Sequence, residues 1–109
     1  MATTFKNVVV KGVGTNLATL VQTTNLTRCT VIGLSLTNIT GSNTIVDVLV
    51  EDDTSTQGYY VKGVIIPPGS SLRVVNQGEK LIMATENQLL VRATQPNSID
   101  AIVSFVEIY

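Results

Sequence analysis

The chain has 109 residues and a mass of 11.6 kDa, which is enough for one domain and too short for two ordinary ones. It contains no His, no Trp and a single Cys, which excludes an intrachain disulfide, a zinc finger, a His-based catalytic triad and CxxC redox chemistry. Seven Lys and Arg residues are scattered singly against eight Asp and Glu residues, so no basic stripe predicts direct nucleic-acid binding.

β-Branched residues dominate the composition, with 16 Val, 9 Ile and 15 Thr. These side chains are stiff and pack well on a pleated sheet, and alternation replaces helical spacing throughout the chain. We predict an all-β, single-domain antiparallel β-sandwich of jelly-roll-like form over residues 1–109. The expected strands are 5–11, 17–22, 28–38, 44–52, 58–65, 71–75, 80–85, 88–94 and 99–108.

The N-terminal segment, residues 1–6, is a possible arm that reaches a neighbouring subunit. It has no apolar stretch of the kind found in signal peptides, and no apolar run in the chain approaches the ~20 residues of a membrane helix. The glycines of Gly12-Val13-Gly14 lack the third glycine and the helix of a dinucleotide fingerprint, so we predict a turn there.

In the segment 28–38, the alternation places Ile32, Leu34 and Leu36 on one strand face, opposite Ser35 and Thr37. Cys29 has no His nearby, and Arg28 points to the other face of the strand. A reactive thiol needs a base or a helix N-terminus. We therefore predict that Cys29 is a buried structural residue.

The next strand, 44–52, alternates buried valines with Asp47 and Glu51 on the opposite face. These two carboxylates lie about 13 Å apart along a strand, which exceeds the separation in glycosidases. The loop Asp52–Gly58 offers oxygen atoms for Ca²⁺ or a glycan, or it is an ordinary solvated loop. Tyr59 and Tyr60 follow it, and they form either a sugar platform or one core contact and one rim contact.

Two turns and a two-faced strand complete the chain. Pro68-Gly69 has the residues of a type II turn after Pro67 ends a strand, and Asn76-Gln77-Gly78 is a second predicted turn. Both faces of the segment 99–108 are largely apolar, so it is covered on both sides or one side contacts a partner. We favour the partner.

The pattern of several segments resembles small β-sandwich virion proteins of tailed bacteriophages, especially those of cyanobacterial and marine phages. The likeness covers residues ~30–109 and is carried by Val31-Ile32-Gly33-Leu34, Val46-Asp47-Val48-Leu49-Val50, Tyr59-Tyr60-Val61, Ile66-Pro67-Pro68-Gly69-Ser70-Ser71-Leu72, Gly78-Glu79-Lys80-Leu81, Leu89-Leu90-Val91-Arg92-Ala93 and Ser98 to Ile108. The resemblance implies a structural role in the virion, without catalytic, cofactor or metal residues. It does not choose between a capsid decoration (cement) protein and a head–tail or tail component.

We therefore expect a non-enzymatic virion protein, made in the host cytoplasm, that decorates the capsid in many copies. The expected partners are the major capsid protein or other virion proteins and further copies of the chain, with a trimer favoured, and neither a membrane nor a cofactor is expected. The alternatives are a neck or tail adaptor and, from another class, a carbohydrate-binding module. The expected contact residues are Ala2, Thr3, Thr4, Phe5, Lys6, Ile102, Val106, Ile108 and Tyr109.

Overall fold

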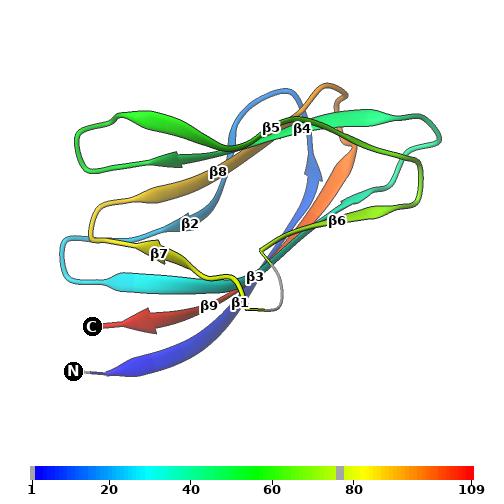
Figure 1. Ribbon diagram of the computed structural model, residues 1–109. Helices are drawn as coiled ribbons and strands as arrows, with labels where there is room; N and C mark the ends of the chain where they lie inside the picture. Colours follow the sequence, from blue (N-terminus) through cyan, green and yellow to red (C-terminus); the bar gives the residue numbers. More distant parts are fainter. Residues whose placement is uncertain (1, 76–77) are drawn as a thin grey trace.

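A computed structural model describes residues 2–75 and 78–109 and contains nine strands (Figure 1). Their bounds are β1 Thr3–Val13, β2 Ala18–Gln22, β3 Arg28–Asn38, β4 Thr44–Glu51, β5 Gln57–Ile66, β6 Ser71–Val75, β7 Leu81–Met83, β8 Gln88–Ala93 and β9 Ile99–Ile108. The predicted all-β class and β-sandwich are confirmed. No helix of the described residues is long and apolar enough to cross a membrane.

The strands form two antiparallel sheets. The first has the order β1-β9-β3-β6, with β7 also paired to β3, and the second has the order β2-β8-β4-β5. The chain crosses from one sheet to the other at most of its connections, which is the strand arrangement of a jelly roll. Strands that are distant in sequence, such as β1 and β9, therefore become neighbours and place the two chain ends side by side (Figure 1).

Strands β6 and β7 share one edge of β3. β6 pairs with Leu34 to Thr37, and β7 pairs with Cys29 to Val31. The two strands together act as one edge strand that is interrupted between residues 75 and 81. The turn predicted at Asn76-Gln77-Gly78 falls in this interruption, and its first two residues lie outside the described part of the chain.

The core lies between the sheets and follows the alternation of the strands. Val46, Val48, Leu89 and Val91 of the second sheet are fully buried and face the buried residues of β3 and β9. In β9, the inward set consists of Ile99, Ala101, Val103 and Phe105. The other apolar face of this strand is directed away from the second sheet.

A bulge in β3 overturns one prediction. The pairing with β9 shifts between Val31 and Gly33, so that the alternation changes phase. Leu34 and Leu36 are buried as expected, but Ile32 is 41 % exposed and does not share their face.

A second difference lies at the N-terminus. β1 begins at Thr3, so most of the segment considered as an arm lies in a strand that pairs with β9. β1 also continues to Val13, and Gly12 lies in it with a positive φ of 64°, where the register with β9 shifts. The turn predicted at Gly12-Val13-Gly14 is therefore a strand irregularity at its first two residues.

The predicted proline corner is confirmed. Gly69 has a φ of 69°, and the N–H of Ser70 donates to the carbonyl of Pro67 over 3.1 Å. This hydrogen bond and the positive φ after Pro68 are the features of a type II turn.

Candidate assembly surface

The outward side of the first sheet carries large apolar side chains on four strands. We call this set the outer apolar face, and its members are Phe5 and Val9 of β1, Ile32 of β3, Ile82 of β7, and Ile102, Val106 and Ile108 of β9. Phe5 and Ile82 are both 77 % exposed and Val9 is 61 % exposed. A single exposed apolar residue is ordinary, but a contiguous group of this kind marks a contact surface.

Strand pairing brings these side chains together. Phe5 lies opposite Val106, and Val9 lies opposite Ile102. On the far side of β9, Val106 lies opposite Thr30, which in turn lies opposite Ile82. Directly opposite residues of an antiparallel pair share a face, so these side chains lie on one side of the sheet from β1 to β7, with Thr30 between Val106 and Ile82.

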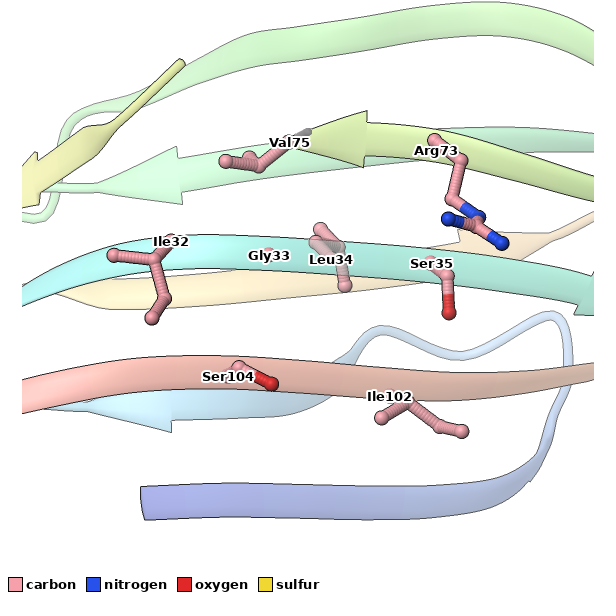
Figure 2. A pocket seen from close by; sticks show the side chains of 8 residues that line it. All are labelled: Ile32, Gly33, Leu34, Ser35, Arg73, Val75, Ile102 and Ser104. Carbon is pink, nitrogen blue, oxygen red and sulfur yellow. The ribbon is translucent and has the colours of Figure 1, made fainter. Parts of the chain in front are cut away.

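An open depression of about 290 Å³ lies on this side of the sheet (Figure 2). Ile32 and Ile102 lie on its rim, and Ser35, Ser104 and Arg73 add polar atoms. It lies beside the β3 bulge and beside a register shift between β3 and β6. Bulges bend strands locally, and this bending accounts for the depression. A surface with polar groups among apolar side chains suits contact with another protein.

The expected contact residues of the chain ends divide between two sides of the sheet. Thr3 and Phe5 share the outer side with Val106 and Ile108. The side chains of Thr4 and Lys6 alternate to the other side, as expected in a strand.

The two chain ends hold each other in place on that other side. Lys6 forms an ion pair of 3.0 Å with Glu107, and the hydroxyls of Thr4 and Tyr109 are 3.2 Å apart. Ala2, which is exposed, and Tyr109 exchange backbone hydrogen bonds. These residues therefore join β1 to β9 within one chain.

The outward side of the second sheet carries a network of polar contacts. Arg92 Nε donates to Asp47 Oδ2 at 3.0 Å, and its Nη2 donates to the Tyr59 hydroxyl at 2.9 Å. Glu51 accepts hydrogen bonds from the amides of Gln57 and Gln88. The two outward sides of the sandwich therefore differ: the second sheet carries this polar network with Ile45 and Ile65 exposed beside it, and the first sheet carries the outer apolar face.

Asp47 is the centre of this network. Partial burial by itself raises the pKa of its carboxyl, but hydrogen bonds from the Gly63 N–H and from Arg92, together with the charges of Arg92 and Lys62, bring the pKa below its ordinary value. The carboxylate is therefore charged at neutral pH, and its oxygens already accept hydrogen bonds from Gly63 and Arg92. It has the role of a structural anchor for β5 and β8.

In the loop considered for Ca²⁺ or glycan binding, one carboxylate oxygen of Asp52 is engaged within the loop. Asp52 Oδ1 accepts hydrogen bonds from the backbone and hydroxyl of Thr54 and from the N–H of Thr56, and these bonds lower the pKa of Asp52. Among residues 2–75 and 78–109, no group of three or more acidic or Cys side chains is placed to hold a metal ion.

The two tyrosines do not divide between core and rim. Tyr59 is 47 % exposed and Tyr60 is 37 % exposed, so the predicted core contact is wrong. β5 is an edge strand with little packed against it. Lys62 Nζ lies 4.6 Å from the centroid of the Tyr59 ring, and the Tyr60 hydroxyl donates to Glu79 at 3.4 Å.

Cys29 is buried, as predicted, with 1 % of its surface exposed. Burial, followed by the charge of Glu107, raises the pKa of its thiol to about 11. The thiol is protonated at neutral pH, which confirms the structural interpretation.

The sequence did not predict three members of the outer apolar face as contact residues: Val9, Ile32 and Ile82. Val9 lies within the run Val8-Val9-Val10, which has no alternation to show its direction. Ile32 changes side because of the bulge, and Ile82 belongs to a three-residue strand. Of these three, only Ile82 could have been placed from the sequence. In a strand it alternates with Leu81 and Met83, and Met83 is fully buried while Ile82 faces outward.

No family model and no curated protein matches the chain by sequence. Among solved structures, a chain of Bacillus endospore appendages, described as disulfide-linked pili, is similar with a TM-score of 0.56 and 11 % identity, covering 96 % of this chain and 86 % of that one. A chain in the capsid structure of Helicobacter pylori bacteriophage KHP30 has a TM-score of 0.54 and 9 % identity, covering 100 % and 89 %. A chain of the T13 IBDV viral particle has a TM-score of 0.53 and 8 % identity, covering 96 % of this chain and 35 % of that one. At these identities the similarity establishes a shared fold.

Proposed function

We propose that this protein is a non-enzymatic structural component of a virus particle, and that it decorates the capsid in many copies. The observation that carries the proposal is the outer apolar face, which the chain leaves uncovered. Each copy would bury this face against shell subunits and so raise the free energy needed to open the shell. Because several copies act together, a modest interface in each copy is sufficient.

The fold that the chain shares with two chains of virus particles supports a structural role in a particle. The capsid chain of phage KHP30 that it resembles is matched over 89 % of its length, so that chain consists of little more than one such domain. In the IBDV particle, the matched domain is only 35 % of the chain.

The proposed contacts are those on the outer side of the first sheet, with Ile102, Val106 and Ile108 at the centre and Phe5 beside them, whereas Tyr109 lies on the other side with Thr4. Complete burial of a large apolar side chain contributes about 1.5–3 kcal/mol. Partly exposed residues contribute a fraction of this and association itself has an entropic cost, so a single copy should bind weakly and retention should depend on several copies acting together.

Ile102→Asp and Ile65→Asp test the contact surface as a matched pair. Both isoleucines are on strands and are comparably exposed, at 47 % and 57 %, but Ile65 of β5 lies in the second sheet. Particles that lack the protein are incubated with each purified variant, and bound copies are counted by quantitative mass spectrometry. We expect Ile102→Asp to reduce occupancy by more than about tenfold and Ile65→Asp to leave it unchanged. Equal occupancy of both variants would contradict the assignment of the surface.

Deletion of residues 1–6 is a second test. It removes Phe5 and the first half of the pairing between β1 and β9, and we expect occupancy to fall. Phe5→Asp removes the apolar contact without shortening the strand and should have a similar effect. Unchanged occupancy in both would exclude the N-terminal segment from the contact.

Copy number distinguishes decoration from the alternative position at the neck or tail. Hundreds of copies per particle correspond to decoration, whereas six, twelve or a few dozen correspond to a neck or tail component. We expect the unit to be a closed homo-oligomer, for which the sequence favoured a trimer. An apolar face does not by itself select a three-fold over a two-fold axis.

Carbohydrate binding is the second candidate, because Tyr59 and Tyr60 are exposed on β5 and jelly rolls include lectin domains. The contacts of Tyr59 argue against carbohydrate binding, because Lys62 lies over its ring and Arg92 donates a hydrogen bond to its hydroxyl. A glycan array probed with the wild type and the Tyr59→Ala/Tyr60→Ala variant tests this candidate. Glycan binding that disappears in the variant would favour it over the apolar contact.

A further inference from the structure

The free edge of β1 differs from the other sheet edges. β1 pairs with β9 without a register shift from Thr3 to Val10. Each of the other edges is short or irregular: β2 has five residues and a shift, β5 has two shifts, and the edge formed by β6 and β7 is interrupted. In residues 2–75 and 78–109 no strand pairs with the outer edge of β1. A long regular edge without proline is a template for another strand.

The hydrogen bonds at the chain ends identify which backbone groups are free. Ala2 and Tyr109 exchange N–H to carbonyl hydrogen bonds in both directions, so Ala2 directs its backbone groups toward β9. In an antiparallel ladder, this direction alternates along the strand. Thr3, Phe5, Asn7 and Val9 therefore direct their N–H and carbonyl groups outward, away from β9.

The side chains of these same four residues lie on the outer side of the sheet, because they pair with Ile108, Val106, Ser104 and Ile102. A second copy of β1 that pairs antiparallel, about a two-fold axis, keeps outer residues opposite outer residues. Two registers use nearly all of the regular stretch. One is centred on Lys6 and the other on Asn7.

Charge and apolar contact decide between the two registers. The register centred on Lys6 places Lys6 opposite its own copy and Phe5 opposite Asn7. The register centred on Asn7 places Phe5, which is 77 % exposed, opposite Val9 of the second copy, which is 61 % exposed, and it does so twice. Opposed like charges are unfavourable in a sheet, whereas aromatic and β-branched side chains form a favourable cross-strand pair.

We propose that two copies of this chain form a dimer through antiparallel pairing of β1 with β1, about a two-fold axis at Asn7. Phe5, Asn7 and Val9 of each copy then exchange backbone hydrogen bonds with Val9, Asn7 and Phe5 of the other. The first sheet continues from one copy into the next. The two outer apolar faces join into one surface, and the dimer replaces the trimer favoured by the sequence.

Cysteine cross-linking tests the register directly. In this register the Asn7 Cα atoms of the two copies lie about 5.5 Å apart, within the range for a disulfide. The matched control is Thr3, on the same strand and side, whose Cα atoms are about 27 Å apart in the dimer. Under mild oxidation, we expect a covalent dimer from Asn7→Cys and none from Thr3→Cys. The buried Cys29 does not interfere. A failure of Asn7→Cys to cross-link, or equal cross-linking of both variants, would overturn the proposal.

A pair of double variants tests the same register without a disulfide. Phe5→Lys/Val9→Lys places like charges opposite each other twice, and Phe5→Glu/Val9→Lys places opposite charges there, while both remove the same apolar pairs. Light scattering after size exclusion should give about 23 kDa for the wild type, which is twice the 11.6 kDa chain. We expect the dissociation constant of the first variant to exceed that of the second by at least about tenfold.

A wild type that is monomeric or trimeric, or equal dissociation constants for the two variants, would refute the dimer. These experiments use the purified protein alone. Their failure is therefore distinguishable from a failure of capsid binding, which is measured on particles.

Discussion

The side chain of Asn38 is a fully buried polar group, and its replacement should strongly destabilise the protein. Its Nδ2 donates to the carbonyls of Ser42 and Ile66, each at 2.8 Å. Its Oδ1 accepts from the backbone N–H of Thr40 at 2.9 Å and from the Thr40 hydroxyl at 2.7 Å. One side chain thus joins the end of β3, the loop before β4 and the end of β5.

The cost of Asn38→Ala follows from the groups that lose their partner. Ile66 is 1 % exposed, so water does not replace the hydrogen bond to its carbonyl, and an unsatisfied buried group costs about 1–3 kcal/mol. Ser42 is exposed and Thr40 half-buried, so water compensates their losses in part. With the lost packing, we expect a decrease of about 3 kcal/mol in the free energy of unfolding.

Thermal and urea unfolding, followed by circular dichroism, measure this change. For 109 residues the entropy of unfolding is about 0.23 kcal/mol per degree, so a loss of ~3 kcal/mol lowers Tm by about 13 °C. Asn43→Ala, at an exposed position in the same loop, is the control and should change stability by less than about 0.5 kcal/mol.

Asn38→Asp separates hydrogen bonding from packing. The carboxylate keeps the shape and the acceptor of the amide, but it cannot donate to the carbonyls of Ser42 and Ile66. We expect it to be destabilised at pH 7 at least as much as Asn38→Ala. An aspartate variant as stable as the wild type would refute the reasoning, because its stability would then depend on shape alone.

Three further changes test other parts of the fold by the same unfolding measurements. Thr44 is fully buried and its hydroxyl has no hydrogen-bond partner in the described chain, so Thr44→Val should stabilise the protein by about 1 kcal/mol. A loss of stability would show that the hydroxyl does form a hydrogen bond in solution. Gly12 and Gly63 have φ values of 64° and 66°, so alanine at either position should cost about 1–2 kcal/mol through backbone strain; the Asn97 side chain that a Cβ at Gly12 would meet is exposed and can turn away, so the two costs should be similar, and a much larger cost at Gly12 would show that Asn97 is held in place. The charged Asp47 carboxylate stabilises the fold at pH values above its ordinary pKa of 3.8, and this stabilisation is lost as the pH falls through the lowered pKa. Asp47→Asn should therefore cost less than about 1 kcal/mol at pH 7, and the difference in stability from the wild type should shrink at pH 2–3. A difference that stays constant with pH would contradict the charged state of Asp47.

Local chemistry in the sequence determined most of the strands. The range of β3, residues 28–38, and that of β6, residues 71–75, were predicted as they are observed. β-Branched residues and alternation favour extended backbone wherever they occur, and Pro67 and Gly69 fix a corner through their own φ preferences. The burial of Cys29 was predicted from its chemistry, because the sequence places no base beside the thiol; strict alternation with Leu34 and Leu36 would have put it on the opposite face.

The sequence also indicated that the last strand has two apolar faces, but only the tertiary structure decided which of them the chain covers. That outcome depends on strand order, which places β9 between β1 and β3 and gives no cover to Ile102 and Val106. Several jelly-roll and Greek-key orders have the same spacing of strands along the chain, so the spacing alone does not determine the neighbours of β9.

The bulge in β3 and the buried polar contacts could not be predicted from the sequence, for the same reason. The bulge that turns Ile32 outward exists only where β3 meets β9, and the amide of Asn38 is satisfied by groups on two other segments. Alternation and turn propensity are properties of neighbours along the chain, so the sequence by itself determined the strands. Edges, outward faces and hydrogen-bond partners are properties of segments brought together from a distance, and only the packing of the two sheets fixed them.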